Sequence, residues 1–337
     1  MHQRDRRSNS AKESGGVLNS LALGLDVGKH KISACLLREH KKKEKTFTND
    51  AVGHDAVVQW LKANDAGLVH ACLESTGGYS EALATVLFDA GHQVSIVNPT
   101  RIKAFAKTEM VRTKTDKVDA ALIARFCQLH RPVLWIAPPK KIREIKGLSR
   151  RLDALIDMRS QELARLEAPG NVDAVQDSIR QTLRSLEAEI AKIEQQLRDR
   201  IDKDEDLRGK RDLLLSVDGI GERTADRLLG EIPLLEEFRN AKAVAAYVGL
   251  SPREWQSGTL RGRTRISKIG NSRLRGALYW PAIVAMRKNA SIRSFAQRLI
   301  AAGKPRMLVI TAAMRKLLCL AYAVLRSGRP YTAPRAA

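Results

Sequence analysis

The stretch that decides the fold is LALGLDVG at residues 21–28, followed closely by KISACLL at residues 31–37. The first run is apolar until Asp26, and Gly28 stands at the turn beyond it. Short apolar runs bounded by turn residues are typical of buried strands. These residues therefore predict two neighbouring strands, with a carboxylate at the end of the first.

Further elements extend outward from this pair. Residues 45–48 predict a third strand, and apolar spacing across residues 51–64 predicts a helix. Beyond them we expect a strand at Leu68–Leu73 that ends at Glu74, a helix at Tyr79–Ala90, a strand at His92–Val97 stopped by Asn98-Pro99, and a helix at Asp116–Leu129 capped by Thr115. Three early strands suit a meander, and the later alternation suits parallel strands covered by helices. The first part of the chain is therefore predicted to be an α/β domain.

Charge along the chain is strongly asymmetric. The 59 Lys and Arg residues outnumber the 37 Asp and Glu residues, which gives a formal net charge of +22. From Trp255 to Ala337 there are 17 Lys or Arg residues and no acid. A folded cationic region of this kind needs a polyanion, which is DNA, RNA or an anionic membrane surface. The cations are not massed on one amphipathic helix, so a nucleic acid is the expected partner and a membrane is not.

Other patterns argue against several classes of protein. The sequence contains no run of 18 apolar residues, so no membrane span is predicted. The polar residues 1–16 do not resemble a secretory signal. The cysteines form no CxxC pair and the histidines no HExxH spacing, which argues against a zinc site. The four cysteines are expected to be reduced, buried thiols of a cytoplasmic protein.

A long helical stretch follows the break at residues 132–139. Leucines mark one helix before Pro169-Gly170, and a second helix carries apolar residues in steps of 4, 3, 4, 3 and 4 through Ile179, Leu183, Leu186, Ile190, Ile193 and Leu197. That spacing is a heptad seam. It fits an intermolecular coiled coil that sets the oligomeric state, or two helices that pack on each other within one chain.

Four carboxylates are the first candidate for chemistry. Asp26 and Glu74 end two strands that would be parallel neighbours, and Asp116 and Asp119 share one face of a helix at i, i+3 spacing. If that helix packs over the strand ends, the four acids converge. Their mutual repulsion would be offset by Mg²⁺ or Mn²⁺, hard ions that prefer oxygen ligands. Taken singly, each acid is more simply a helix cap or a solvated charge.

The basic region holds two further candidates. Gly219 and Gly221 lie in a glycine hairpin between two helices, which either approaches a phosphate or is a plain packing unit. Ser257 lies in a turn, where it is either a nucleophile surrounded by phosphate-binding cations or simply a loop residue. The cations expected to contact nucleic acid are Arg261, Arg263, Arg265, Lys268, Arg273 and Arg275.

Taken together, these motifs resemble the DEDD transposases of bacterial insertion sequences, which are described as bridge-RNA-guided recombinases. The resemblance runs from about Leu21 to about Arg329. Its motifs are LDVGK at 25–29, LESTGGY at 73–79, KTDKVDA at 114–120, the Gly219-Ile220-Gly221 hairpin and the segment from Ser257-Gly258 to Lys268-Ile269-Gly270-Asn271.

The resemblance implies an RNase H-like (RuvC-like) domain whose metal-binding acids are Asp26, Glu74, Asp116 and Asp119. It implies that Ser257 attacks DNA and is held transiently as a phosphoserine, in a composite site shared between subunits of a dimer or tetramer. It also implies a structured guide RNA, and a bacterial, nucleoid-associated location.

The expected organisation is a tail at 1–19, a RuvC-like catalytic domain at 20–140 and a helical coiled-coil segment at 141–208. A mostly helical, basic transposase domain with a helix-hairpin-helix follows at 209–330, and 331–337 is a second tail. Two alternatives remain. A RuvC-like, metal-dependent DNA endonuclease would need the acids and not Ser257. A non-catalytic nucleic-acid-binding protein would need neither.

Overall fold

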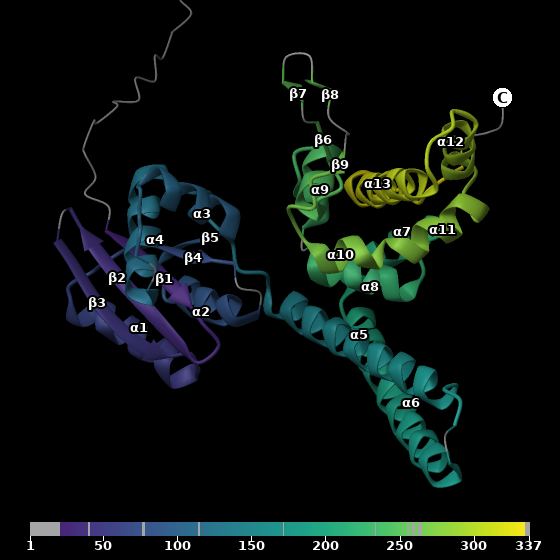
Figure 1. Cartoon of the computed structure of the whole chain (residues 1–337), viewed down its shortest axis with the longest axis horizontal. Coiled ribbons are helices and arrows are strands. Elements are labelled where there is room, and N and C mark those ends of the chain that lie inside the picture. The colour runs from purple at the N-terminus through teal and green to yellow at the C-terminus, as the bar shows by residue number, and fades with distance from the viewer. Residues whose placement is uncertain are drawn as a thin grey trace, which may run out of the picture. The chain divides into compact units, whose positions relative to one another are not determined.

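The computed structural model describes residues 21–39, 41–75, 78–113, 115–170, 172–232, 234–254, 256–257, 260–261 and 265–333. The chain divides into two compact units, Met1–Ala137 and Pro138–Ala337 (Figure 1). The segment expected to form a central coiled coil thus lies within the second unit. Each unit is described by itself.

Unit 1 is built on one five-stranded sheet. Its strands are β1 (Ala22–Val27), β2 (Lys31–Arg38), β3 (Lys41–Thr48), β4 (His70–Glu74) and β5 (Gln93–Val97), in the order β3-β2-β1-β4-β5. The first three strands are antiparallel, whereas β4 runs parallel to β1 and β5 runs parallel to β4. A three-stranded meander continued by parallel strands is the RNase H-like arrangement, so the predicted fold of this unit is confirmed.

Helices cover both faces of that sheet (Figure 1). They are α1 (Ala51–Ala63), α2 (Gly78–Asp89), α3 (Pro99–Thr108) and α4 (Asp116–His130). Leu23, Leu25 and Val27 of β1 are buried in one core with residues of α1 and α2. On the other face, Ala22 and Cys72 share a core with residues of α3 and α4. Alternate residues of β1 therefore face opposite layers, as the two-residue period of a strand requires.

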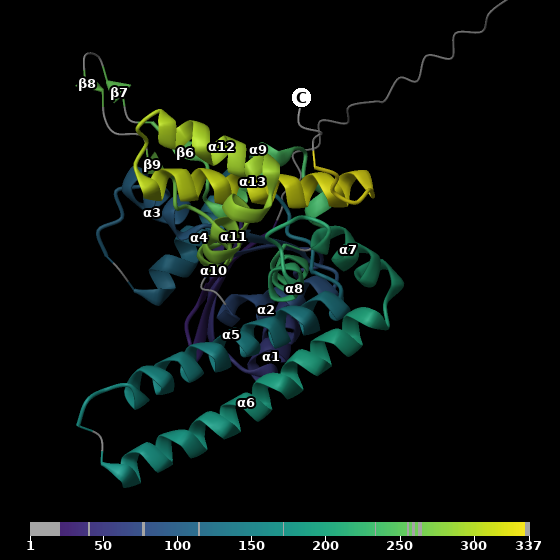
Figure 2. The same cartoon turned by 90° about the vertical axis from the view of Figure 1, so that its right-hand side faces the viewer.

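Unit 2 begins with a long helical hairpin, α5 (Lys140–Leu166) and α6 (Asp173–Asp202), which Figure 2 shows side by side. The predicted heptad residues Ile190, Ile193 and Leu197 are buried in one core with Leu152 and Leu155 of α5. This heptad seam therefore packs within the chain, as the intrachain alternative expects. Its use between chains remains a prediction.

The rest of unit 2 is helical apart from two short strand pairs. The helices are α7 (Glu205–Leu215), α8 (Glu222–Glu231), the 3₁₀ turn η1 (Leu235–Glu237), α9 (Ala241–Val248), α10 (Ser272–Ala277), α11 (Tyr279–Lys288), α12 (Ala290–Ala301) and α13 (Arg306–Ser327). Strand β6 (Pro252–Arg253) pairs with β9 (Arg265–Ile266), and β7 (Gln256–Ser257) pairs with β8 (Leu260–Arg261).

Helix α13 is the core helix of this unit. By length and composition it is apolar enough to cross a membrane, with a mean hydropathy of 1.8 over its most apolar window, half of which is buried. Its buried residues, including Ile310, Ala313 and Leu317, share one core with α7, α8, α9 and α11. The helix is apolar because it packs against other helices along its length, and core helices of water-exposed proteins pass the same test.

Candidate active site

The ends of β1 and β4 place two of the predicted acids together. The parallel register pairs Leu25 with Leu73, so Asp26 and Glu74 are the next residues on the two strands. Residues at matching positions of neighbouring strands project to the same face of a sheet. Both acids are half-buried. The strand register therefore places Asp26 and Glu74 side by side, as predicted.

That face is the one covered by α4. A Cβ built on Gly24 would lie 2.1 Å from the carbonyl oxygen of Ala120 and 2.2 Å from the amide nitrogen of Ala124, so α4 crosses β1 in direct backbone contact. Asp26 lies two residues beyond Gly24 and projects to the same face. Glu74 likewise follows Cys72, which is buried in one core with Ile123 of α4. Both carboxylates therefore lie on the α4 side of the sheet.

The first turn of α4 brings the other two acids to this end of the sheet. Thr115 caps the helix as predicted, its hydroxyl accepting from the amide of Val118 at 3.3 Å. Asp116 and Asp119 occupy the first turn, where the helix dipole favours negative charge. Asp116 lies one turn before Ala120, and Asp119 lies directly before it; Ala120 is one of the residues of α4 that touch β1. The four predicted acids thus share one sheet face and one end of it.

Lys31 lies beside the predicted carboxylates, and sequence reasoning missed it. Its Nζ lies 2.5 Å from Asp116 Oδ2, with both side chains about half exposed or more. The hydrogen bond to Asp116, reinforced by the negative charges of Asp116 and Asp26, raises the pKa of Lys31. An ammonium group thus faces two of the four carboxylates. Lys31 opens β2 directly after the turn that follows Asp26, and that proximity in sequence was the available signal.

The acids suit a divalent metal ion by chemistry and by placement, although they do not form a closed ligand set. Carboxylate oxygens are the ligands that Mg²⁺ and Mn²⁺ prefer. Within the described ranges, no three His, Cys, Asp or Glu side chains form a group that could hold a metal ion. Binding an ion here would need the carboxylates to draw together.

Ser257 ends a strand rather than lying in a turn. It is the last residue of β7, and its backbone pairs with Leu260 of β8, while Gln256 pairs with Arg261. The connecting residues Gly258 and Thr259 lie outside the described part of the chain. The candidate serine therefore sits at the outer end of a short hairpin in unit 2, and the four acids belong to unit 1.

The predicted basic contacts divide into two groups. Arg275 makes hydrogen bonds within unit 2, since its Nη1 donates to the carbonyls of Val248 at 3.0 Å and Lys268 at 3.3 Å. Arg265 and Arg273 are exposed. Lys268 is exposed as well, with a left-handed backbone at φ 55°. Nothing is described of the Arg261 side chain, and Arg263 lies outside the described residues.

The segment before α10 is anchored on a buried carboxylate that sequence reasoning also missed. Asn271 caps α10 and donates from Nδ2 to Glu231 Oε2 at 3.0 Å. Arg150 donates to the same carboxylate from Nε at 2.6 Å and from Nη2 at 3.1 Å. Burial would raise the pKa of Glu231, but the hydrogen bonds and charge of Arg150 lower it. Asn271 is thus a structural residue that ties this segment to α8 and α5.

The glycine hairpin before α8 is chiefly a packing unit. Gly219 has φ +104°, and a Cβ there would lie 2.6 Å from the Cβ of Ala285 on α11. This glycine therefore serves the turn and the close approach of α11. Gly221 is the N-cap of α8, and a Cβ there would meet nothing within 4 Å. Only Gly221 leaves the backbone open to a ligand, and phosphate binding there remains a prediction.

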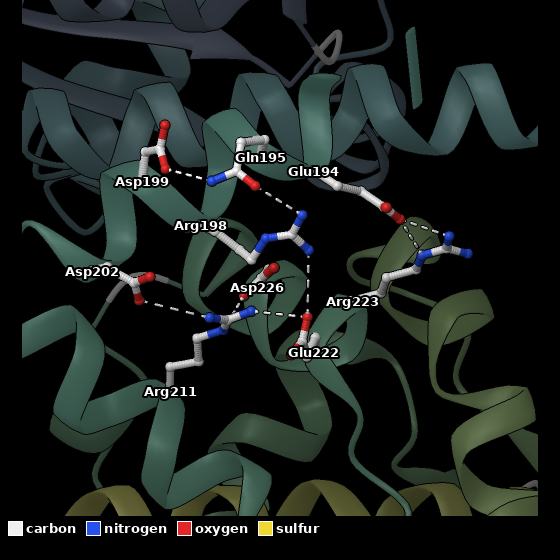
Figure 3. Close-up of polar contacts among 9 residues, drawn as sticks. All are labelled: Glu194, Gln195, Arg198, Asp199, Asp202, Arg211, Glu222, Arg223 and Asp226. Carbon is white, nitrogen blue, oxygen red and sulfur yellow. Dashed lines mark hydrogen bonds and ion pairs between the residues drawn. The ribbon is translucent and has the colours of Figure 1, made fainter. Parts of the chain in front are cut away.

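Beside Gly221 lies a cavity of about 340 Å³, lined by residues of α5, α6 and the first turn of α8. Figure 3 shows that its charged groups are already joined to one another. Arg223 Nη2 lies 2.7 Å from Glu194 Oε1, and Arg211, which is buried, lies 3.0 Å from Asp226 and 3.3 Å from Glu222. Acids already occupy the N-terminus of α8. We therefore interpret this network of ion pairs as a structural brace that joins α6, α7 and α8.

Comparisons with known proteins cover most of the chain. A family model for DEDD transposases of the IS110 type matches residues 23–169, and the model "Transposase IS116/IS110/IS902 family" matches residues 211–297. The chain is 35% identical over 320 residues to the "Pilin gene-inverting protein" of Moraxella lacunata, covering 92% of this chain and 97% of the relative.

Two more distant similarities accompany these matches. The "Transposase for insertion sequence element IS1328" of Yersinia enterocolitica is 23% identical over 300 residues, covering 80% of this chain and 85% of the relative. Among solved structures, T. thermophilus RuvC in complex with a Holliday junction substrate matches 33% of this chain and 95% of its own, at 13% identity and a TM-score of 0.27.

Proposed function

Because this chain belongs to the IS110 family of DEDD transposases, enzymes that cleave and join DNA, we propose that it does so at a composite site. One half is the carboxylate set of unit 1, made of Asp26, Glu74, Asp116 and Asp119. The other half is the Ser257 hairpin of unit 2. The observation that carries the proposal is the register of β1 and β4 under α4, which gathers the acids at one end of one sheet face.

The carboxylates would hold Mg²⁺ or Mn²⁺. When bound, such an ion would stabilise the negative charge on the attacking and leaving oxygens of a phosphodiester. Asp26 and Glu74 are held by the sheet, so they fix the position of the site. Asp116 and Asp119 sit on the first turn of α4, where Lys31 neutralises Asp116 until a stronger cation replaces it.

The Ser257 hydroxyl is the proposed nucleophile. Its Oγ would attack the phosphorus of the scissile phosphodiester, forming an Oγ–P bond as the bond from phosphorus to one sugar oxygen breaks. The serine proton leaves to a base and the departing sugar oxygen takes up a proton. A DNA hydroxyl would then attack the phosphoserine and restore the serine. Because each step exchanges one phosphoester for another, joining needs no external energy source.

The basic surface supports two further parts of the proposal. The 17 Lys and Arg residues between Trp255 and Ala337, unopposed by any acid, suit a partner with more than one strand of phosphates. A structured guide RNA that selects donor and target DNA by base pairing would fit this surplus. A composite site in which the acids and the serine come from different subunits would make the enzyme a dimer or tetramer.

A metal-dependent endonuclease that uses water instead of Ser257 is the second candidate. It is favoured by the placement of all four carboxylates within unit 1, since this mechanism needs no residue of unit 2. A non-catalytic binding role, by contrast, does not fit a family of DNA-cleaving enzymes.

Cleavage assays separate the two candidates. Full-length protein would be incubated with DNA carrying the element's ends, in Mg²⁺, as wild type, Asp26→Asn and Ser257→Ala. We expect both variants to lose cleavage by a factor of at least about 100, as removal of a metal ligand or a nucleophile does. Asp55→Asn, which changes an acid on α1, is the matched control and should cleave normally. Cleavage that survives in Ser257→Ala alone would establish the water mechanism instead.

A further inference from the structure

Helices α10 and α11 form one continuous helical run with an exposed tryptophan at its centre. The amide of Leu278 donates to the carbonyl of Leu274 at 3.1 Å, and the amide of Ala282 donates to Leu278 at 3.0 Å, so the hydrogen-bond ladder crosses the junction. Figure 1 shows α10 leading directly into α11. Leu274, Leu278, Ala282 and Ala285 are buried, and they define the inner face of the run.

The opposite face carries Trp280, which is 71% exposed, and Val284, one turn along, which is 42% exposed. Arg273 and Arg287 lie seven residues to either side of Trp280 and are exposed as well. Seven residues are nearly two helical turns, so the three side chains fall in one line, with steps of about 10 Å between them. We call Arg273, Trp280, Val284 and Arg287 the tryptophan stripe.

The positive charge around the tryptophan stripe indicates an anionic partner. Within the described part of the chain, neither Arg273 nor Arg287 forms a salt bridge, and the sequence supplies no acid beyond Glu254. The Trp280 ring packs edge-to-face with Tyr279 at 5.3 Å between centroids, yet it stays largely exposed. An exposed indole between two guanidinium groups suits a ligand with apolar faces and negative charges at regular intervals. Nucleic-acid strands have that chemistry, since every base has a π-face and every nucleotide a phosphate.

We propose that the tryptophan stripe binds unpaired DNA, with one base stacked on the Trp280 indole and phosphates on Arg273 and Arg287. Bases paired within a duplex present no free face to a side chain, so the stripe requires a strand that has been opened. A single strand of DNA is the partner because the family acts on DNA. The inference rests on the proposed function and adds to it a site that holds opened DNA during cleavage and joining.

Binding of full-length protein to a fluorescein-labelled oligothymidylate of about 20 nucleotides tests the proposal, because single-strand sites span roughly 4–16 nucleotides. Trp280→Ala should weaken the affinity about 5- to 150-fold, the range for loss of one stacked base. Trp280→Phe, which keeps an aromatic face, should recover most of it. Ile300→Ala, which removes exposed apolar area from α12 outside the stripe, should change the affinity by less than about two-fold.

Indole emission gives an independent readout. Oligothymidylate should quench the emission of wild-type protein more than that of Trp280→Phe, and the difference reports the stacked residue. Arg273→Ala and Arg287→Ala should each reduce the slope of log affinity against log salt by about 0.7, the value per phosphate contact on a single strand. Circular dichroism would confirm that the variants fold.

Four outcomes would overturn the proposal. Trp280→Ala binding within two-fold of wild type removes the stacking role, and an equal loss of duplex binding shows a general defect. A loss confined to RNA assigns the stripe to a different nucleic acid. Loss of self-association, with unchanged binding to oligothymidylate, makes it an interface between copies of this chain. Ser257→Ala should still bind oligothymidylate, so failure of the serine mechanism and failure of the stripe are distinguishable.

Discussion

Lys31 Nζ lies 2.5 Å from Asp116 Oδ2, on the side of the sheet where Asp26 also projects. A lysine thus supplies positive charge beside the carboxylates proposed to hold a metal ion. The Lys31 ammonium would repel a divalent cation placed beside it, so we expect the ion pair to oppose metal binding at Asp116.

Removing the Lys31 ammonium should therefore make the metal easier to bind. We expect Lys31→Met to lower the Mn²⁺ concentration for half-maximal protection of the protein against thermal unfolding about two- to five-fold, in keeping with the modest strength of exposed ion pairs. Lys29→Met, two residues away and without an ion pair among the described residues, is the matched control. A higher Mn²⁺ requirement in Lys31→Met would show that the lysine assists metal binding.

The contact between β1 and α4 should be intolerant of any side chain at Gly24. A Cβ there would lie 2.1 Å from Ala120 O, so Gly24→Ala must push α4 away from the sheet. We expect a loss of about 1–3 kcal/mol in the free energy of unfolding, measured by urea denaturation, together with a loss of cleavage. At Gly67 nothing lies within 4 Å of a Cβ, so Gly67→Ala should stay within about 0.5 kcal/mol of wild type. Equal effects of the two substitutions would contradict the packing of α4 described above.

The brace of Figure 3 should respond to pH through Asp226. Burial raises the pKa of this carboxyl to about 6, against the opposing charge of Arg211. Because the folded pKa lies above the unfolded value, protonation favours the folded state, and its contribution grows as pH falls through about 6. Between pH 7 and pH 5 the free energy of unfolding should rise by about 1 kcal/mol more in wild type than in Asp226→Asn. Parallel pH profiles of the two proteins would rule out this titration.

Asn271 should matter for stability in two separate ways. It caps α10 through Leu274, and it donates to the buried carboxylate of Glu231. Asn271→Ala loses both contacts and should destabilise the protein by about 1–3 kcal/mol. Asn271→Asp keeps the capping oxygen but places a second carboxylate beside Glu231, so it should also be destabilising. An Asp variant as stable as wild type, measured by thermal unfolding, would show that capping is the only role.

The sequence predicted the succession of strands along unit 1 because its apolar runs are short and separated by strong turn residues. Helix α3 was missed, since Asn98-Pro99 was interpreted as a stop. In the structure Asn98 is the N-cap, accepting from Thr100 at 2.8 Å, and Pro99 is the first helical residue. Proline fixes the backbone angle that a helix start needs, so the same dipeptide that ends a strand begins a helix.

The candidate site was predictable only where local pattern determined position. Asp26, Glu74, Asp116 and Asp119 each stand at a strand end or helix start, so topology alone predicts that they lie at one end of one sheet face, while their joint binding of a metal ion stays a prediction. Lys31 and Glu231 act through partners 85 and 81 residues away, Asp116 and Arg150, which no local pattern reveals. Gly219 resembled a phosphate-binding glycine, yet its close contact is with Ala285, and only the packing of α11 shows that.

The proposed mechanism requires Ser257 to form a covalent bond with DNA under the control of the acidic site. The most direct measurement is to trap the full-length protein on DNA carrying the element's ends in Mg²⁺, digest both polymers and locate the modified residue by mass spectrometry. We expect a nucleotide phosphoester on Ser257 in wild type, absent from both Ser257→Ala and Asp26→Asn. Cleaved DNA without any adduct, or an adduct on another residue, would contradict it.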